Sequence, residues 1–211
     1  MRLRAPGRYA WRLVGLASIL WAVACRSSPP VDPLQVASPP QPPSAESGSE
    51  PTPSGPGSST LKLTSPAFAP GSPIPIKYSC DGANASPPLE WNFPAGEAQS
   101  FALIVDDPDA PGRTWVHWVI YNIPGTSARL PEGVPPEAEL ANGVNLGVNS
   151  SGELGYAGPC PPGATHRYFF RLYALDSVLD SAPGLTAEDL TAAMTGHILS
   201  TAELMGTYGQ K

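Results

Sequence analysis

The chain has 211 residues, of which 12 are Lys or Arg and 18 are Asp or Glu, so its formal net charge is −6 at pH 7. Residues 61–211 alone carry seven basic and fifteen acidic side chains, a net charge of −8. A nucleic-acid partner is therefore excluded, because neutralising phosphates requires a basic face.

Residues 1–24 have the pattern of a secretory signal peptide. Residues 1–12 contain four arginines and no acid, and residues 13–24, LVGLASILWAVA, carry no charge. A basic segment followed by an apolar one is typical of export signals. The apolar run of 12 residues is shorter than the about 20 that a membrane-spanning helix needs. We therefore expect this segment to direct export and to be removed.

A lipidation signal is predicted at Cys25. The sequence Ala22-Val23-Ala24-Cys25 resembles the lipobox of bacterial lipoproteins. The prediction is an exported lipoprotein of the bacterial cell envelope, anchored to a membrane through Cys25. Arg26, and not Asp, follows the cysteine, which favours the outer membrane, facing the periplasm, in a Gram-negative host. The alternative is ordinary cleavage after Ala24.

Residues 25–60 are predicted to form a disordered tether. Ten Pro, nine Ser and three Gly occur among the 35 residues 26–60, and these residue types cannot build a packed core. A Pro-rich segment is semi-extended and would hold a domain at a distance from its anchor. The alternative is a disordered leader without a mechanical role.

Residues 61–211 are long enough for one domain with its own core. They contain two cysteines, Cys80 and Cys160, which form an even pair in an exported, oxidising setting. We treat them as a candidate disulfide, with two free thiols as the alternative.

The pattern of this domain is mainly β. Short extended runs, separated by Pro, Gly and Asn, occupy residues 74–78, 89–92, 101–106, 115–123 and 168–174. They predict an antiparallel β-sandwich. The run 101–106, FALIVD, is apolar on both faces and predicts a central strand. A long loop region is expected at 131–162.

The helical part is predicted to be small and C-terminal. Thr186 and Asp189 form a capping-box pattern, followed by Leu190, Ala193 and Met194 at helical spacing. A second short helix or turn is expected at 197–204.

Polar side chains gather at three places in the domain. DDPDAP at 106–111 follows the apolar run, His117 and Trp118 lie within an aromatic strand, and the Gly/Pro loop 155–163 leads to His166. Because side chains alternate along a strand, His117 and Trp118 are expected to point to opposite faces. A carboxylate favours a protonated imidazole, whose two nitrogens both donate hydrogen bonds, and glycine amides add donors. This set predicts a small pocket for a phosphate or carboxylate group.

The order of the motifs resembles one protein family. The segments are YSCDG at 78–82, SPPLEW at 86–91, DDPDAP at 106–111, VHW at 116–118, GYAGPCPPG at 155–163, HRY at 166–168 and LYALD at 172–176. Together they resemble the bacterial, Raf-kinase-inhibitor-like branch of the phosphatidylethanolamine-binding family over about residues 61–209.

The resemblance implies a sandwich of antiparallel sheets with a pocket at one end for phosphate, phosphoethanolamine or acetate. It implies a pocket with two acids, two histidines and two wall positions. The acids would be Asp107 and Asp109, the histidines His117 and His166, and the wall positions Gly158 and Tyr168. It also implies a cis bond between Ala110 and Pro111. The signal, the lipobox-like cysteine and the tether are additions to the family pattern, and they argue against a cytoplasmic role.

Three classes of function are compatible with these residues. The first is a membrane-tethered protein that binds an anionic or phosphorylated small ligand, such as a lipid head group. The second is an inhibitor or interaction protein acting on a kinase, protease or other envelope enzyme, with the loop 131–149 as its contact region. An enzyme is disfavoured because the chain has neither a Gly-x-Ser-x-Gly elbow nor a His-Glu-x-x-His motif.

No cofactor or metal is predicted. A zinc site would have to use His117, His166, Cys160 and Asp109, but these residues lack the paired short spacing of zinc motifs. His197 is expected to be structural.

Overall fold

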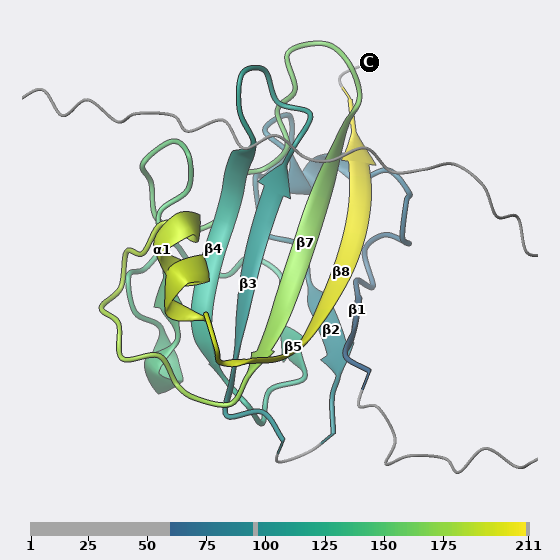
Figure 1. Ribbon diagram of the computed structural model, residues 1–211. Coiled ribbons are helices and arrows are strands. Elements are labelled where there is room, and N and C mark those ends of the chain that lie inside the picture. Colours follow the sequence, from purple (N-terminus) through teal and green to yellow (C-terminus); the bar gives the residue numbers. More distant parts are fainter. Residues whose placement is uncertain (1–59, 95–96, 210–211) are drawn as a thin grey trace, which may run out of the picture. The chain divides into compact units, whose positions relative to one another are not determined.

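The computed structural model describes residues 60–94 and 97–209, which form two antiparallel sheets facing each other (Figure 1). The predicted signal peptide, Cys25 and the tether lie outside the described residues. The five-stranded sheet has the order β6-β4-β3-β7-β8 and the three-stranded sheet the order β1-β2-β5. The elements are β1 (Lys62–Thr64), η1 (Ile76–Tyr78), β2 (Leu89–Asn92), β3 (Ser100–Asp107), β4 (Trp115–Pro124), β5 (Arg129–Leu130), η2 (Ala141–Gly143), β6 (Asn145–Leu146), β7 (His166–Leu175), α1 (Ala187–Ala193) and β8 (Ile198–Tyr208).

Strand β3 is central, as its apolar pattern predicted. All eight of its residues are buried. Phe101, Leu103 and Val105 face the main core between the two sheets, whereas Ala102 and Ile104 face a second core on the opposite side of the five-stranded sheet. The antiparallel β-sandwich is thus confirmed, with β3 covered on both faces.

The small helix is also confirmed. Thr186 accepts a hydrogen bond from the Asp189 amide, and the Asp189 side chain accepts one from the Thr186 amide, so the predicted capping box is formed. Leu190 and Met194 of this segment pack in the second core. In the described ranges, none of the helices combines the length and the apolar character that crossing a membrane requires.

Two element predictions were wrong. Residues 76–78 form the short 3-10 helix η1, and residues 74 and 75 belong to no strand, because Pro73 and Pro75 have no amide proton to donate to a strand ladder. Residues 197–204 are not helical: the chain reverses at Gly196, with φ +85°, and enters β8, which pairs with β7 along its length. Cross-strand pairing overrides the weak local preference for helix there.

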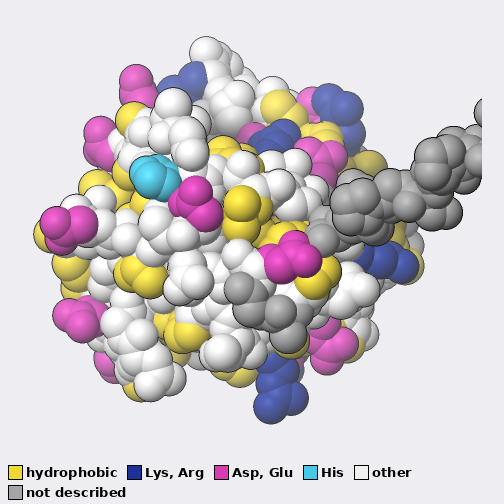
Figure 2. All heavy atoms as spheres, turned by 60° about the horizontal axis from the view of Figure 1, so that its bottom comes forward, with side chains coloured by type: hydrophobic (Ala, Val, Ile, Leu, Met, Phe, Trp, Pro, Cys, Tyr) yellow, Lys and Arg dark blue, Asp and Glu magenta, His cyan; other side chains and the backbone are white. Residues whose placement is uncertain are grey.

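Charged side chains are dispersed over one end of the domain. Figure 2 shows the face at the lower end of the domain, where acidic and basic side chains are scattered among apolar and uncharged ones.

Candidate functional site

A cavity of about 460 Å³ lies at the end of the five-stranded sheet where β3 ends and where β4 and β7 begin. Two loops close it, one around Cys80 and one around Gly158. The cavity is lined by Cys80, Asn84, Asp107, Ala110, Pro111, Trp115, His117, Ser151, Ala157, Gly158, Cys160, Pro161, Pro162, His166 and Tyr168. Five of the six predicted pocket residues are therefore brought together, and Asp109 is not among them.

Asp107 and His166 form a buried pair in this cavity. Asp107 Oδ2 lies 2.7 Å from His166 Nδ1, and the two residues are only 3% and 7% exposed. The other carboxylate oxygen, Oδ1, accepts a hydrogen bond of 2.8 Å from the Asp109 amide. Asp107 thereby fixes the orientation of the His166 ring, which uses Nδ1 for the carboxylate and has Nε2 left to meet a ligand.

His117 enters the cavity through a β-bulge. Val105 of β3 pairs with Trp118 of β4, but the next residue, Asp106, pairs with Val116, so His117 is the extra residue. The prediction that His117 and Trp118 face opposite sides was therefore wrong. His117 packs edge-on against Tyr168, and Trp118 lies in the main core, on the same side of the sheet. Bulges of this kind redirect a side chain at the end of a strand.

The His117 ring is held in its neutral form at neutral pH. Its Nδ1 donates to the Ala157 carbonyl oxygen at 2.7 Å. Burial lowers the pKa of His117, and the carbonyl groups of Ala157 and Gly158 and the charge of Asp107 offset this only in part. A protonated imidazole is therefore not expected at His117, because the loss of hydration lowers the pKa of the ring by more than the nearby carboxylate raises it.

Tyr168 forms the cavity wall beneath the His117 ring. Burial, followed by the negative charge of Asp107, raises the pKa of the Tyr168 phenol above its usual range. The hydroxyl group therefore keeps its proton, and Tyr168 is a neutral wall residue.

Gly158 lies where two loops approach each other closely. A Cβ atom at this position would lie 2.5 Å from the Tyr78 carbonyl oxygen and 2.6 Å from Asn84 Oδ1. The Gly158 amide donates to Asn84 Oδ1 at 2.7 Å, so it supports the wall and is not available to a ligand. This differs from the expected role of the glycine amides as anion donors.

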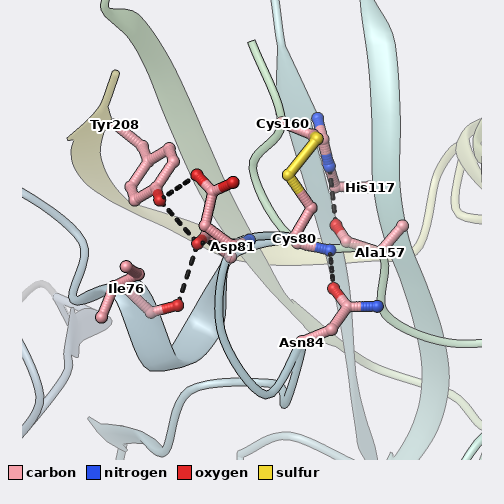
Figure 3. Close-up of a disulfide and its surroundings, with 10 residues drawn as sticks. Ile76, Cys80, Asp81, Asn84, His117, Ala157, Cys160 and Tyr208 are labelled. Carbon is pink, nitrogen blue, oxygen red and sulfur yellow. Dashed lines mark hydrogen bonds between the residues drawn. A yellow bond between two sulfur atoms is a disulfide. The ribbon is translucent and has the colours of Figure 1, made fainter. Parts of the chain in front are cut away.

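A disulfide between Cys80 and Cys160 joins the same two loops (Figure 3). The Cys80 amide also donates to the Pro159 carbonyl at 3.1 Å, and the Tyr156 hydroxyl to the Tyr78 carbonyl at 2.7 Å. Both half-cystines line the cavity, so the covalent link is part of its wall.

The loop before the disulfide is also fixed to the end of β8. The Tyr208 hydroxyl donates to Asp81 Oδ2 at 2.6 Å and accepts from Ser79 Oγ at 2.7 Å (Figure 3). The wall formed by Cys80 is thus held on both sides, by the Gly158 loop and by β8.

Asp109 does not line the cavity and binds Arg167. Its carboxylate accepts two hydrogen bonds from the guanidinium, of 2.7 and 2.9 Å, and one of 3.0 Å from the Arg167 amide. These bonds lower the pKa of Asp109 to about 2. The prediction of Asp109 as a pocket acid is therefore not borne out by its position, since the adjacent arginine on β7 captures its side chain.

The geometry contradicts one further expectation. The bond between Ala110 and Pro111 is trans, so the cis prediction was wrong, and Gly112, with φ +84°, supplies the reversal of the chain. In the described part of the chain, no cluster of three or more His, Cys, Asp or Glu side chains could hold a metal ion. Cys160 is used by the disulfide and Asp109 by Arg167.

Trp115, Asn84 and Ser151 are among the cavity residues that were not predicted from the sequence. Trp115 lies two positions before His117, and period-two alternation along the strand places both on one face, so a signal was present. Asn84 has a positive φ of 52°, in the loop after the disulfide, and no local pattern reveals its bond to Gly158.

Comparisons with known proteins agree with this architecture. The sequence model of the family described as phosphatidylethanolamine-binding protein matches residues 64–209. A UPF0098 protein of Methanothermobacter thermautotrophicus is 55% identical over 148 residues, which cover 70% of this chain and 98% of the relative. A Mycobacterium tuberculosis protein named as a candidate lipoprotein, LppC, is 42% identical over 172 residues, covering 81% of this chain and 82% of the relative.

Two solved structures are similar to the domain. A candidate homologue of the phosphatidylethanolamine-binding protein from Chlamydia trachomatis is 48% identical, with a TM-score of 0.67, and the match covers 73% of this chain and 100% of the other. YbcL of E. coli, described as a member of the mammalian family, is 30% identical, with a TM-score of 0.66 and coverage of 72% and 99%.

Proposed function

The chain belongs to the phosphatidylethanolamine-binding protein family, and from this we propose that its cavity binds a small ligand bearing a phosphate or carboxylate group. The observation that carries the proposal is the convergence of the Asp107–His166 pair and of His117 on one cavity of about 460 Å³. A cavity of this size suits a small molecule or a head group.

The charges in the cavity indicate that the anion binds together with a proton. Among the described residues, no Lys or Arg lines the cavity, and Asp107 contributes a buried carboxylate. His117 donates through Nδ1 to the protein, so its Nε2 carries a lone pair and accepts. A neutral His166 with its proton on Nδ1 would present a second lone pair. A hydrogen bond between either histidine ring and the anion then requires protonation of His166 or an acidic proton on the ligand.

Phosphate affinity is therefore expected to fall as pH rises from 6 to 8. For a single coupled proton the decrease is at most about tenfold per pH unit. The measurement is isothermal titration calorimetry of the purified full chain with phosphate, phosphoethanolamine and acetate, in two buffers of different ionisation enthalpy. His166→Ala should weaken phosphate binding by more than about tenfold, because it removes the ring that Asp107 orients.

His197→Ala is the matched control. His197 pairs with Asp176 at 2.8 Å on the exposed surface and does not line the cavity, so its removal should leave the affinity unchanged. The proposal is wrong if none of the three anions binds, or if the His166 and His197 variants bind alike.

We further propose that the chain is anchored to a membrane through Cys25. The lipobox-like sequence ending at Cys25 supports this, as does the similarity to a relative named as a candidate lipoprotein. Cys25→Ser should move the expressed protein from the detergent-soluble membrane fraction to the aqueous fraction, because a thioether-linked lipid supplies the anchor. Ser27→Ala is the control. Equal membrane retention of all three proteins would contradict the anchor.

A further inference from the structure

Arg113 lies beside the cavity and has no acidic partner within the described part of the chain. It is exposed, in the loop between β3 and β4, and its guanidinium carbon lies 5.4 Å from the centre of the Trp115 ring. Trp115 lines the cavity, so the guanidinium is stacked on a cavity-lining ring. Stacking on an aromatic face leaves the edge of the guanidinium, with its N–H donors, available for hydrogen bonding.

The other basic residues are engaged or placed elsewhere. Among residues 60–94 and 97–209, Lys77, Arg167 and Arg171 form ion pairs with acids. Lys62 and Arg129 belong to β1 and β5 of the three-stranded sheet. Within these ranges, Arg113 is therefore the basic side chain that is both unpaired and in contact with a cavity-lining residue.

The negative charge of the domain makes the position of Arg113 important for the approach of an anion. The domain has a net charge of −8 and the cavity holds a carboxylate, so an approaching anion is repelled over most of the surface. A cation at the entrance offsets that repulsion locally. An arginine also fits phosphate and carboxylate oxygens with two parallel hydrogen bonds.

We propose that the natural ligand carries two anionic groups, one bound in the cavity and a second bound outside it by Arg113. This inference rests on the proposed function, because it requires the first group to occupy the cavity. It assigns Arg113 as a specificity-determining residue that selects small molecules with two acidic groups over those with one.

The test compares two matched probes, propyl phosphate and 1,3-propanediol bisphosphate, by titration calorimetry of the full chain. The wild type should bind the bisphosphate about tenfold more tightly, the effect of one charge-assisted contact. Arg113→Gln should abolish this preference while leaving the affinity for propyl phosphate within about twofold, since only the second group is lost. Arg113→Lys should keep part of the preference, because it retains the charge but not the planar fork.

Arg129→Gln is the control for general charge, since it also removes one exposed base. Equal affinity of the wild type for both probes would overturn the inference, as would an equal effect of Arg113→Gln and Arg129→Gln on the preference. If propyl phosphate binding is lost in His166→Ala but Arg113→Gln keeps the full preference for the bisphosphate, the role of Arg113 alone is refuted. Failure of both probes to bind the wild type would refute the proposed function as well.

Discussion

Reduction of the Cys80–Cys160 disulfide is expected to lower the free energy of unfolding by about 4 kcal/mol. The two cysteines are 80 residues apart in the sequence, so the bond removes a large loop-closure entropy from the unfolded chain. Both are exposed in the folded state, so their reduction leaves no buried void to add to this loss. The loss of stability therefore comes from the greater conformational freedom of the reduced, unfolded chain.

The measurement is denaturant unfolding of oxidised protein, of reduced protein and of a variant with both Cys80→Ser and Cys160→Ser. The reduced protein and the double variant should have the same midpoint, below that of the oxidised protein. A difference of less than about 1 kcal/mol between oxidised and reduced protein would contradict the prediction. Two free thiols in a titration of the unfolded, unreduced protein would contradict the bond itself.

Ligand binding should be less sensitive to reduction than stability is. Three hydrogen bonds still join the two loops when the disulfide is open: those from the Cys80 amide, the Gly158 amide and the Tyr156 hydroxyl. Each contributes about 1 kcal/mol, so the cavity wall retains most of its position. Phosphate affinity measured on reduced protein should accordingly fall by less than about tenfold.

The parts of the fold that were predictable are those fixed by local pattern. The continuous apolar run of β3 requires cover on both faces, and the capping box at Thr186 fixes the start of α1 whatever lies around it. The region 197–204 was missed because its structure is decided by pairing with β7, which is distant in the sequence. Local propensity carries little information about such pairing.

The same distinction applies to the site. Asp107 ends β3 and His166 begins β7, which are antiparallel, so their convergence at one end of the sheet could be expected. The orientation of His117 could not, because it depends on a bulge that exists only in the register between β3 and β4. The orientation of Asp109 could not be expected either, because its carboxylate could enter the cavity or bind Arg167.

Asp107→Ala is expected to cost about 3 kcal/mol of stability and to weaken phosphate binding by more than about tenfold. The substitution leaves two donors without their acceptor, the buried His166 Nδ1 and the part-buried Asp109 amide. It also frees the His166 ring to rotate, so the ligand loses an oriented partner.

Asp107→Asn separates the two effects. Its amide oxygen can still accept from one of the two donors, so about half of the stability loss should be recovered. Because the amide is neutral, the site loses the negative charge that favours binding of a proton together with the anion, and the pH dependence of phosphate binding between pH 6 and 8 should flatten. The readouts are denaturant midpoints and calorimetric affinities at both pH values.

Asp109→Ala is the matched control on the same loop. Its carboxylate pairs with an exposed arginine, where solvent screens the interaction, so its removal should affect stability less than Asp107→Ala does. It should also leave phosphate affinity unchanged, since Asp109 does not line the cavity.

Should Asp107→Asn bind phosphate with wild-type affinity and pH dependence, the charge of Asp107 would have no role in protonating the site, and the ligand itself would have to bring the proton.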